Sequence, residues 1–228
     1  MPPSSWPAMG LFLAVVAFVA CAAVAGVAVV AKPEQRWRDG SIAALGVAVW
    51  MGVTAIPPWV GALSAEEPLP SMPLFFGSQT LFTLALVASP LGKRLSGLSS
   101  GWLLAFQGFR FPLELVLAAW VAEGRVPPQM TWTGSNPDIL AGLAALALAP
   151  FATRHRAVAW LGWGITMALL LNVMRVVVAS FPSPVQRFDE PVLLAFSVPE
   201  VWIVSMCVIG ALTGELLLLR RLLSTSQG

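Results

Sequence analysis

Long apolar stretches alternate with short polar connections along the whole chain. A helix needs about 20 apolar residues to cross the roughly 30 Å hydrocarbon core of a bilayer. Hydropathy defines seven stretches of this kind, of which the fifth is short. They run over residues 9–31, 41–63, 73–90, 101–122, 138–153, 157–180 and 198–219. The pattern predicts an all-α, polytopic transmembrane helix bundle of about seven spans, folded as a single integral membrane domain over residues 1–228.

The charges in the connections predict the orientation of this bundle. With seven spans, one side of the membrane receives Lys32, Arg36, Arg38, Lys93, Arg94, Arg154, Arg156, Arg220 and Arg221. The other side receives Glu66, Glu67, Glu123, Arg125, Arg187, Asp189 and Glu190. Lys and Arg concentrate in cytoplasmic loops. We therefore expect the N-terminus outside and the C-terminus in the cytoplasm, in the cytoplasmic (inner) membrane of the cell.

The composition agrees with burial in lipid. Hydrophobic residues make up 57% of the chain and charged residues 11%, and the mean hydropathy is +0.81. Soluble domains carry roughly 25% charged residues, because water must wet their surface. The net charge is only +2, and no basic run suggests nucleic acid. The lipid bilayer is the expected surrounding, and nucleic acid is not an expected partner.

The fourth span carries the strongest polar signal. Gln107, Arg110 and Glu114 follow the spacing i, i+3, i+7, which places them on one helical face. A charge at mid-membrane costs at least about 2.5–3.5 kcal/mol, so it should face the bundle interior or water. The i, i+4 spacing predicts that Arg110 and Glu114 pair, and Pro112 between them should kink the helix. Two interpretations remain open, a binding site and a buried ion pair that fixes helix packing.

Further polar residues fall in the outer half of other spans. Asn172 and Arg175 lie on one face of the sixth span, and Glu200 begins the seventh at a similar depth. A bridge between Arg175 and Glu200 would link adjacent helices, whereas the alternative for Arg175 is snorkelling to the headgroups. Gln79, with Thr83 one turn later, belongs to either a cavity or a hydrogen bond between helices.

The segment that enters the fifth span combines capping residues with a charge. Asn136 is typical of an N-cap, Pro137 of the first helical position, and Asp138 of an acid in the first turn. Capping alone accounts for these residues, yet the free amides of a helix start that points into the bundle also suit an anion. We expect Glu215, near the inner end of the seventh span, to snorkel toward the cytoplasm.

Several classes of protein are disfavoured by what the sequence lacks. No His, Cys and Asp cluster has metal-site spacing, and no nucleotide-binding or nucleophile-elbow motif occurs. The only lysines, Lys32 and Lys93, lie in connections, which excludes a retinal Schiff base inside the membrane. We therefore predict neither a metal nor a cofactor.

Three functions fit this sequence. The first is a cavity in the outer half that binds or transports a small polar solute or an ion, lined by Gln79, Gln107, Arg110, Glu114, Asp138, Asn172, Arg175 and Glu200. The second is a non-catalytic subunit or assembly factor of a larger membrane complex. In that case Gly210 and Gly214 could contact a membrane-protein partner or a second copy of the chain. The third is a membrane-embedded enzyme using Glu114 or Glu200 as acid or base. No nucleophile supports the third, so a non-enzymatic role is favoured.

Overall fold

The computed structural model describes residues 4–64 and 69–224, and the regular secondary structure in these ranges consists of helices with no strand. Six helical stretches are long and apolar enough to cross a membrane. They are α1 (Trp6–Val30), α2 (Arg36–Trp59) preceded by the 3-10 turn η1 (Pro33–Gln35), α3 (Ser71–Ala88), the stretch Ser100–Ala122, α8 (Arg156–Ala179) and Ile203–Ser224. The predicted all-α membrane bundle is confirmed.

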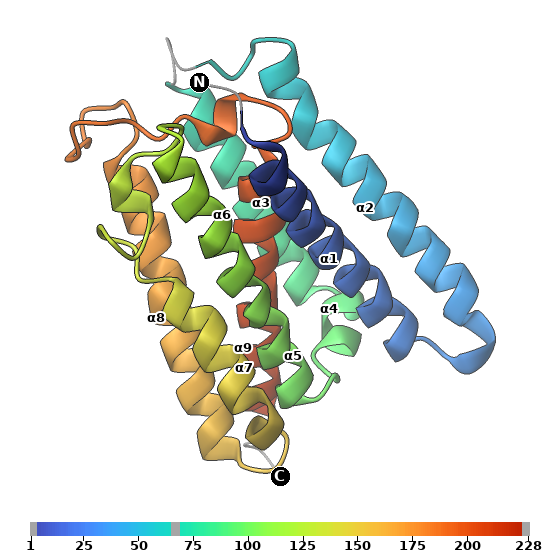
Figure 1. The fold of residues 1–228 in the computed structure, drawn as a ribbon. Coiled ribbons are helices and arrows are strands. Elements are labelled where there is room, and N and C mark those ends of the chain that lie inside the picture. Colours follow the sequence, from blue (N-terminus) through green and yellow to red (C-terminus); the bar gives the residue numbers. More distant parts are fainter. Residues whose placement is uncertain (1–3, 65–68, 225–228) are drawn as a thin grey trace.

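The fifth predicted span is the short helix α7 (Ile139–Ala152). Its 14 residues rise only about 21 Å, less than the thickness of the hydrocarbon core. The segment over residues 123–138, which includes the 3-10 turn η3 (Pro128–Met130), lies in the upper part of the bundle, and α7 continues below it (Figure 1). Irregular backbone at membrane depth requires burial in protein or a polar cavity. Several of these residues are buried, namely Val126, Met130, Thr131, Asn136 and Asp138.

The fourth span is interrupted at the point where the sequence predicts a kink. It consists of α5 (Ser100–Phe106), the 3-10 turn η2 (Gln107–Phe109) and α6 (Arg110–Ala122). Ser99 caps the start, because its hydroxyl accepts a hydrogen bond from the amide of Trp102 at 3.2 Å. Pro112 has no amide hydrogen for the carbonyl of Gly108. The interruption lies one turn before Pro112 and directs Gln107 and Arg110 into the bundle.

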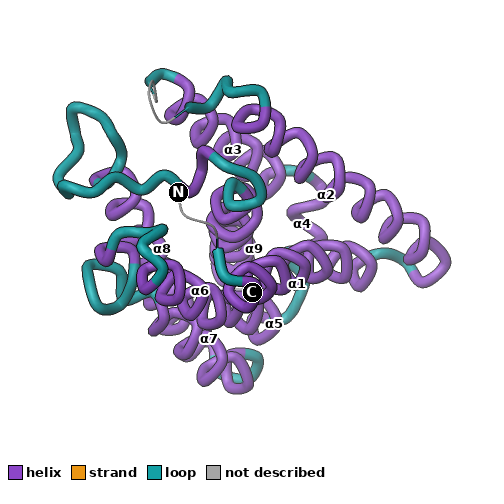
Figure 2. Tube along the Cα trace, turned by 45° about the horizontal axis from the view of Figure 1, so that its top comes forward, coloured by secondary structure: helices purple, strands orange, loops and turns teal. Residues whose placement is uncertain are grey.

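The last span occupies the middle of the molecule. It begins as the π-helical turn η5 (Ile203–Val208) and continues as α9 (Ile209–Ser224). Helices α1, α3, α5 and α8 pack around it, whereas α2 packs chiefly against α1 and leans away from the rest (Figure 2). Helix α1 begins at the upper end of the bundle and α9 ends at the lower end (Figure 1).

Indole side chains hold α2 to the central span. The Trp50 indole donates to the carbonyl of Ser205 at 3.0 Å, and the Trp202 indole donates to the carbonyl of Met51 at 3.1 Å. The remaining connections contain the short helix α4 (Pro90–Leu95) and the 3-10 turn η4 (Leu194–Phe196). The two indole hydrogen bonds fix the half of α2 that ends at Trp59. Most large apolar side chains of this half point away from the bundle.

Candidate functional site

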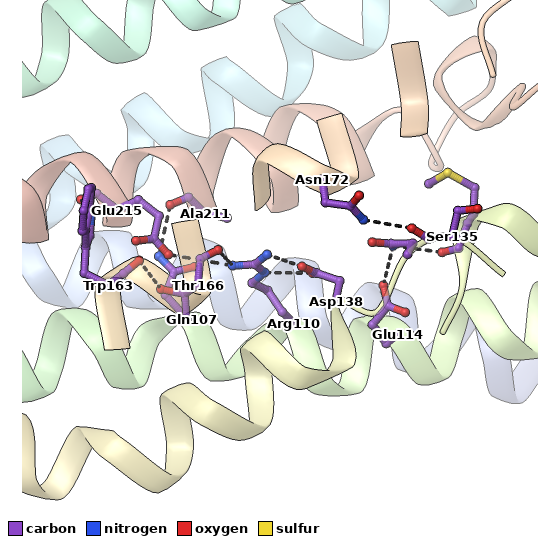
Figure 3. Close-up of polar contacts among 12 residues, drawn as sticks. Gln107, Arg110, Glu114, Ser135, Asp138, Trp163, Thr166, Asn172, Ala211 and Glu215 are labelled. Carbon is purple, nitrogen blue, oxygen red and sulfur yellow. Dashed lines mark hydrogen bonds and ion pairs between the residues drawn. The ribbon is translucent and has the colours of Figure 1, made fainter. Parts of the chain in front are cut away.

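Arg110 lies at the centre of a buried polar cluster (Figure 3). Its guanidinium makes a bidentate ion pair with Asp138, in which Nε donates to Oδ2 at 2.8 Å and Nη2 donates to Oδ1. Nη1 donates to the carbonyl of Thr166 at 2.7 Å. The two charged side chains are only 2% and 6% exposed. The paired fork geometry is the strongest arrangement available to an arginine and a carboxylate.

The predicted pairing of Arg110 with Glu114 is wrong. Among the described residues, the ion pairs of Arg110 are with Asp138 and Glu215. Glu114 lies one turn further along α6, where its Oε1 accepts a hydrogen bond from Asn136 Nδ2 at 3.1 Å. Helical spacing places Arg110 and Glu114 on one face of the span, but it does not exclude a closer ion pair between Arg110 and a carboxylate from another helix. That partner is Asp138, which lies at the start of the short helix α7.

Asn136 does not cap α7, contrary to the sequence-based prediction. Its amide nitrogen donates to Glu114 and also to the carbonyl of Met130 at 3.0 Å. Asp138 occupies the N-cap position instead, and its side chain makes no cap hydrogen bond because it binds Arg110. Asn172 supports the same segment, since its Nδ2 donates to the carbonyl of Ser135 at 2.9 Å.

Glu215 lies behind Arg110 and does not snorkel. Its side chain is fully buried, and Oε1 is 3.8 Å from Arg110 Nη1. Within the described chain, neither carboxyl oxygen of Glu215 accepts a hydrogen bond. Gln107 lies on the same side of the cluster and donates to the carbonyl of Ala211 at 3.1 Å. The sequence singled out Glu215 but predicted that its side chain reaches the cytoplasmic interface, whereas it lies buried beside Arg110.

The predicted bridge between Arg175 and Glu200 is also wrong. Arg175 is exposed, and its Nη2 donates to Asn172 Oδ1 at 2.9 Å. Glu200 is buried and pairs with Arg125 at 2.5 Å, and the Arg125 guanidinium also lies 5.1 Å from the centre of the Trp120 ring. The sequence places Arg125 in an outer connection, which gives no sign that its side chain turns inward.

Gln79 and the pair Gly210 and Gly214 make contacts within the chain. The Gln79 amide donates to the carbonyl of Phe75 within α3, and Gln79 does not line the cavity described below. Gly210 and Gly214 pack inside the chain: a Cβ atom on Gly210 would meet Val19 at 3.0 Å, and one on Gly214 would meet Phe106 at 2.9 Å. The two glycines therefore allow close approach of α1 and α5 to α9 within this chain.

A cavity of about 830 Å³ adjoins the cluster. Its walls come from α3, from α8 and from the π-helical turn η5. The connection over residues 181–195 also contributes to its lining. The polar side chains at its floor belong to Arg110, Glu114, Asn136 and Asp138. The walls are almost entirely apolar and include Met72, Phe76, Val173, Val177, Val204 and Cys207. This combination of apolar walls with a few convergent polar groups is typical of ligand pockets, which measure about 300–1,000 Å³.

The chain matches no family model, no curated protein and no solved structure. Its chemistry therefore has to be read from the site itself.

The cluster offers binding groups without a metal centre. No group of three or more His, Cys, Asp or Glu residues in the described ranges is arranged to hold a metal ion. Arg110 is occupied by Asp138 and by a backbone carbonyl, and three carboxyl groups, of Asp138, Glu114 and Glu215, surround this one cation. The arrangement can orient and bind a polar group that enters the cavity.

Proposed function

We propose that this multi-pass membrane protein binds an amphiphilic molecule in the cavity between α3 and α8. The observation that carries the proposal is the cavity itself, with apolar walls around a floor formed by Arg110, Glu114, Asn136 and Asp138. An apolar chain would fill the walled part, and a polar end would reach the floor. Burying such a chain contributes about 25 cal/mol per Å² of apolar surface.

The position of the cavity rim supports entry from the bilayer. Two side chains at the rim are largely exposed, Leu81 on α3 at 68% and Val178 on α8 at 56%. Both belong to helices that are long and apolar enough to cross the membrane. An opening between these helices would face acyl chains, and this favours an amphiphile over the small polar solute or ion that the sequence suggested.

The cavity also argues against the alternative of a non-catalytic structural subunit. A protein whose polar groups only pin its helices should have a filled core with every buried polar atom paired. Glu114 Oε2 and Asn136 Oδ1 accept no hydrogen bond from any described residue, and both residues line the cavity. Unpaired acceptors beside empty space favour a binding site.

A photoactivatable hexadecanol, with a diazirine in its chain, tests the proposal. The protein is placed in phosphatidylcholine nanodiscs, irradiated with the probe and mapped by peptide mass spectrometry. We expect labelling of Val204 and Cys207, which line the cavity and are only 5% and 1% exposed. Labelling confined to outward-facing residues such as Leu45 on α2 would indicate ordinary lipid contact and would contradict the proposal.

Two matched glycine variants provide the control. A Cβ atom on Gly77 or on Gly52 would meet nothing within 4 Å, so both positions accept a larger side chain. Gly77 lines the cavity from α3, whereas Gly52 belongs to α2 and does not. We expect Gly77→Trp to suppress labelling of Cys207 and Gly52→Trp to leave it unchanged. Equal labelling in both variants would show that the probe reaches Cys207 by another route.

A further inference from the structure

Two buried oxygen atoms at the floor of the cavity lack a donor. Glu114 is 1% exposed and Asn136 is fully buried, and both line the cavity. Glu114 uses Oε1 to accept from Asn136, and Asn136 uses its amide nitrogen as donor. This leaves Glu114 Oε2 and Asn136 Oδ1, both without a hydrogen bond from the described chain. An unsatisfied buried acceptor costs roughly 1–3 kcal/mol, so a missing donor is expected at this position.

The neighbouring arginine cannot be that donor. Arg110 donates through Nε and Nη2 to Asp138 and through Nη1 to the carbonyl of Thr166. The bidentate pair with Asp138 also balances its charge. Among the residues that the structure describes, Glu114 therefore has no cation of its own, and its side chain accepts a hydrogen bond from the neutral amide of Asn136.

We propose that the ligand's polar end is an ammonium group, which donates to Glu114 Oε2 and Asn136 Oδ1. The inference rests on the proposed function, because it names the class of amphiphile that the cavity takes. An ammonium group carries several donors and no acceptor, and it meets a carboxylate and an amide oxygen. It also supplies the positive charge that Glu114 lacks, in a setting where a charge-assisted hydrogen bond is about twice as strong as a neutral one.

Other headgroups fit this floor less well. A hydroxyl group offers a single donor and no charge. A carboxylate offers no donor, and it would be placed beside Glu114 and Asp138, where like charges oppose each other. The expected order of affinity is therefore alkylamine, then alkanol, then alkanoate.

Competition against the photoactivatable hexadecanol measures this order. Unlabelled hexadecylamine, hexadecanol and hexadecanoate are compared at equal chain length, with Cys207 labelling as the readout. We expect hexadecylamine to displace the probe at about one-tenth of the hexadecanol concentration, since one charge-assisted hydrogen bond is worth about tenfold in affinity. Hexadecanoate should be the weakest competitor. Equal potency of amine and alkanol would overturn the inference while the proposed function stands, and loss of Cys207 labelling in the wild-type protein would overturn both.

Glu114→Gln separates the role of the charge from the integrity of the fold. The variant keeps the size of the side chain, but it removes the charge and replaces one acceptor oxygen by an amide donor. We expect hexadecanol to displace the probe as in the wild-type protein, and hexadecylamine to lose most of its advantage. An undiminished preference for the amine in Glu114→Gln would place the cation elsewhere and contradict the proposed contact. If Glu114→Gln does not fold, Asn136→Leu tests the second contact, because it removes the amide acceptor, and hexadecylamine should then lose part of its advantage.

Discussion

The buried ion pair of Arg110 with Asp138 contributes to the stability of the protein only while both charges are present. Each side chain is nearly inaccessible, and Asp138 neutralises the guanidinium directly. Asp138→Asn removes the charge of the bidentate partner and leaves Glu215, at 3.8 Å, as the remaining ion-pair partner of Arg110. Removing one partner of a buried pair costs roughly 3–5 kcal/mol. We expect a clearly lower melting temperature for Asp138→Asn in detergent, and partial recovery when Arg110→Gln is added. Purely additive losses would show that the two residues are energetically independent.

The exposed pair Arg38–Asp39 is the control for this prediction. Its N–O distance is 3.0 Å, but the Arg38 side chain is 66% exposed. Exposed pairs contribute roughly 0–1 kcal/mol. Asp39→Asn should therefore leave the melting temperature nearly unchanged under the same conditions.

Glu200 allows a direct comparison of two arginines. The structure pairs it with Arg125 at 2.5 Å, whereas Arg175 is exposed and binds Asn172. Arg125→Ala removes a buried ion pair and the contact with Trp120, so we expect a loss of roughly 3–5 kcal/mol in stability. Arg175→Ala should cost less than about 1 kcal/mol. Thermal unfolding of the two variants decides between them, and a larger effect of Arg175→Ala would reverse the assignment.

At the scale of residues, the sequence identified the central groups but not their partners. Mid-membrane depth and helical periodicity predicted that Arg110 and Glu114 point inward, and both are buried. The partners Asp138, Asn136 and Glu215 come from other elements, so their contacts depend on how the helices pack. Spacing within one helix cannot supply that information. Pairing Arg110 with Glu114 was therefore the natural prediction and the wrong one.

At the scale of elements, the close packing of α7 on α6 places Asp138 in the cluster. Gly142 allows this close packing because it has no side chain. A Cβ atom on Gly142 would lie 2.7 Å from Phe111 Cβ and close to the backbone of α6. Gly142→Ala must push α7 away from α6. This shift also displaces the start of α7, where Asp138 lies. We expect a loss of about 1–3 kcal/mol in stability, as for other overpacked sites.

Gly164 provides the matched control on α8. It is exposed, and a Cβ atom there would meet nothing within 4 Å. Gly164→Ala should leave stability unchanged or raise it by up to about 1 kcal/mol, because alanine favours the helix. A melting temperature of Gly142→Ala equal to that of Gly164→Ala would contradict the close packing of α6 and α7.

Hydropathy predicted the elements well and their irregularities less well. The long spans and the short fifth helix lie close to the predicted ranges, and the interruption of the fourth span falls near Pro112. Apolar length and proline chemistry are local properties, so a sequence displays them. The descent of residues 123–138 into the bundle depends on buried contacts with Glu114 and Asn172, which have no local signature.

For the whole molecule, the charged connections predict the orientation in the membrane. Ser183 lies in the connection before the last span, which the loop charges predict to be outside, and His155 is exposed in the connection between α7 and α8, which they predict to be cytoplasmic. We expect Ser183→Cys to react with an impermeant maleimide in intact cells and His155→Cys to react only after permeabilisation. The wild-type protein, whose cysteines are Cys21 and Cys207, is the blank. Reaction of His155→Cys in intact cells would reverse the orientation.

The cavity belongs to the molecule as a whole, and no single segment reveals it. Its lining comes from four regions of the chain, between residues 69 and 211. The sequence suggested a cavity because polar residues converge at one depth, but it could not show that the walls are apolar. That difference changes the expected ligand from a small polar solute to an amphiphile with a polar end.

The most direct test of ligand binding is an experimental structure of the protein purified in nanodiscs with hexadecylamine. We predict elongated density between α3 and α8 that ends within hydrogen-bond distance of Glu114 Oε2 and Asn136 Oδ1. The same density should be absent from Gly77→Trp. A cavity that is filled by protein side chains in the wild-type structure, with α3 packed directly on α8, would contradict the binding function.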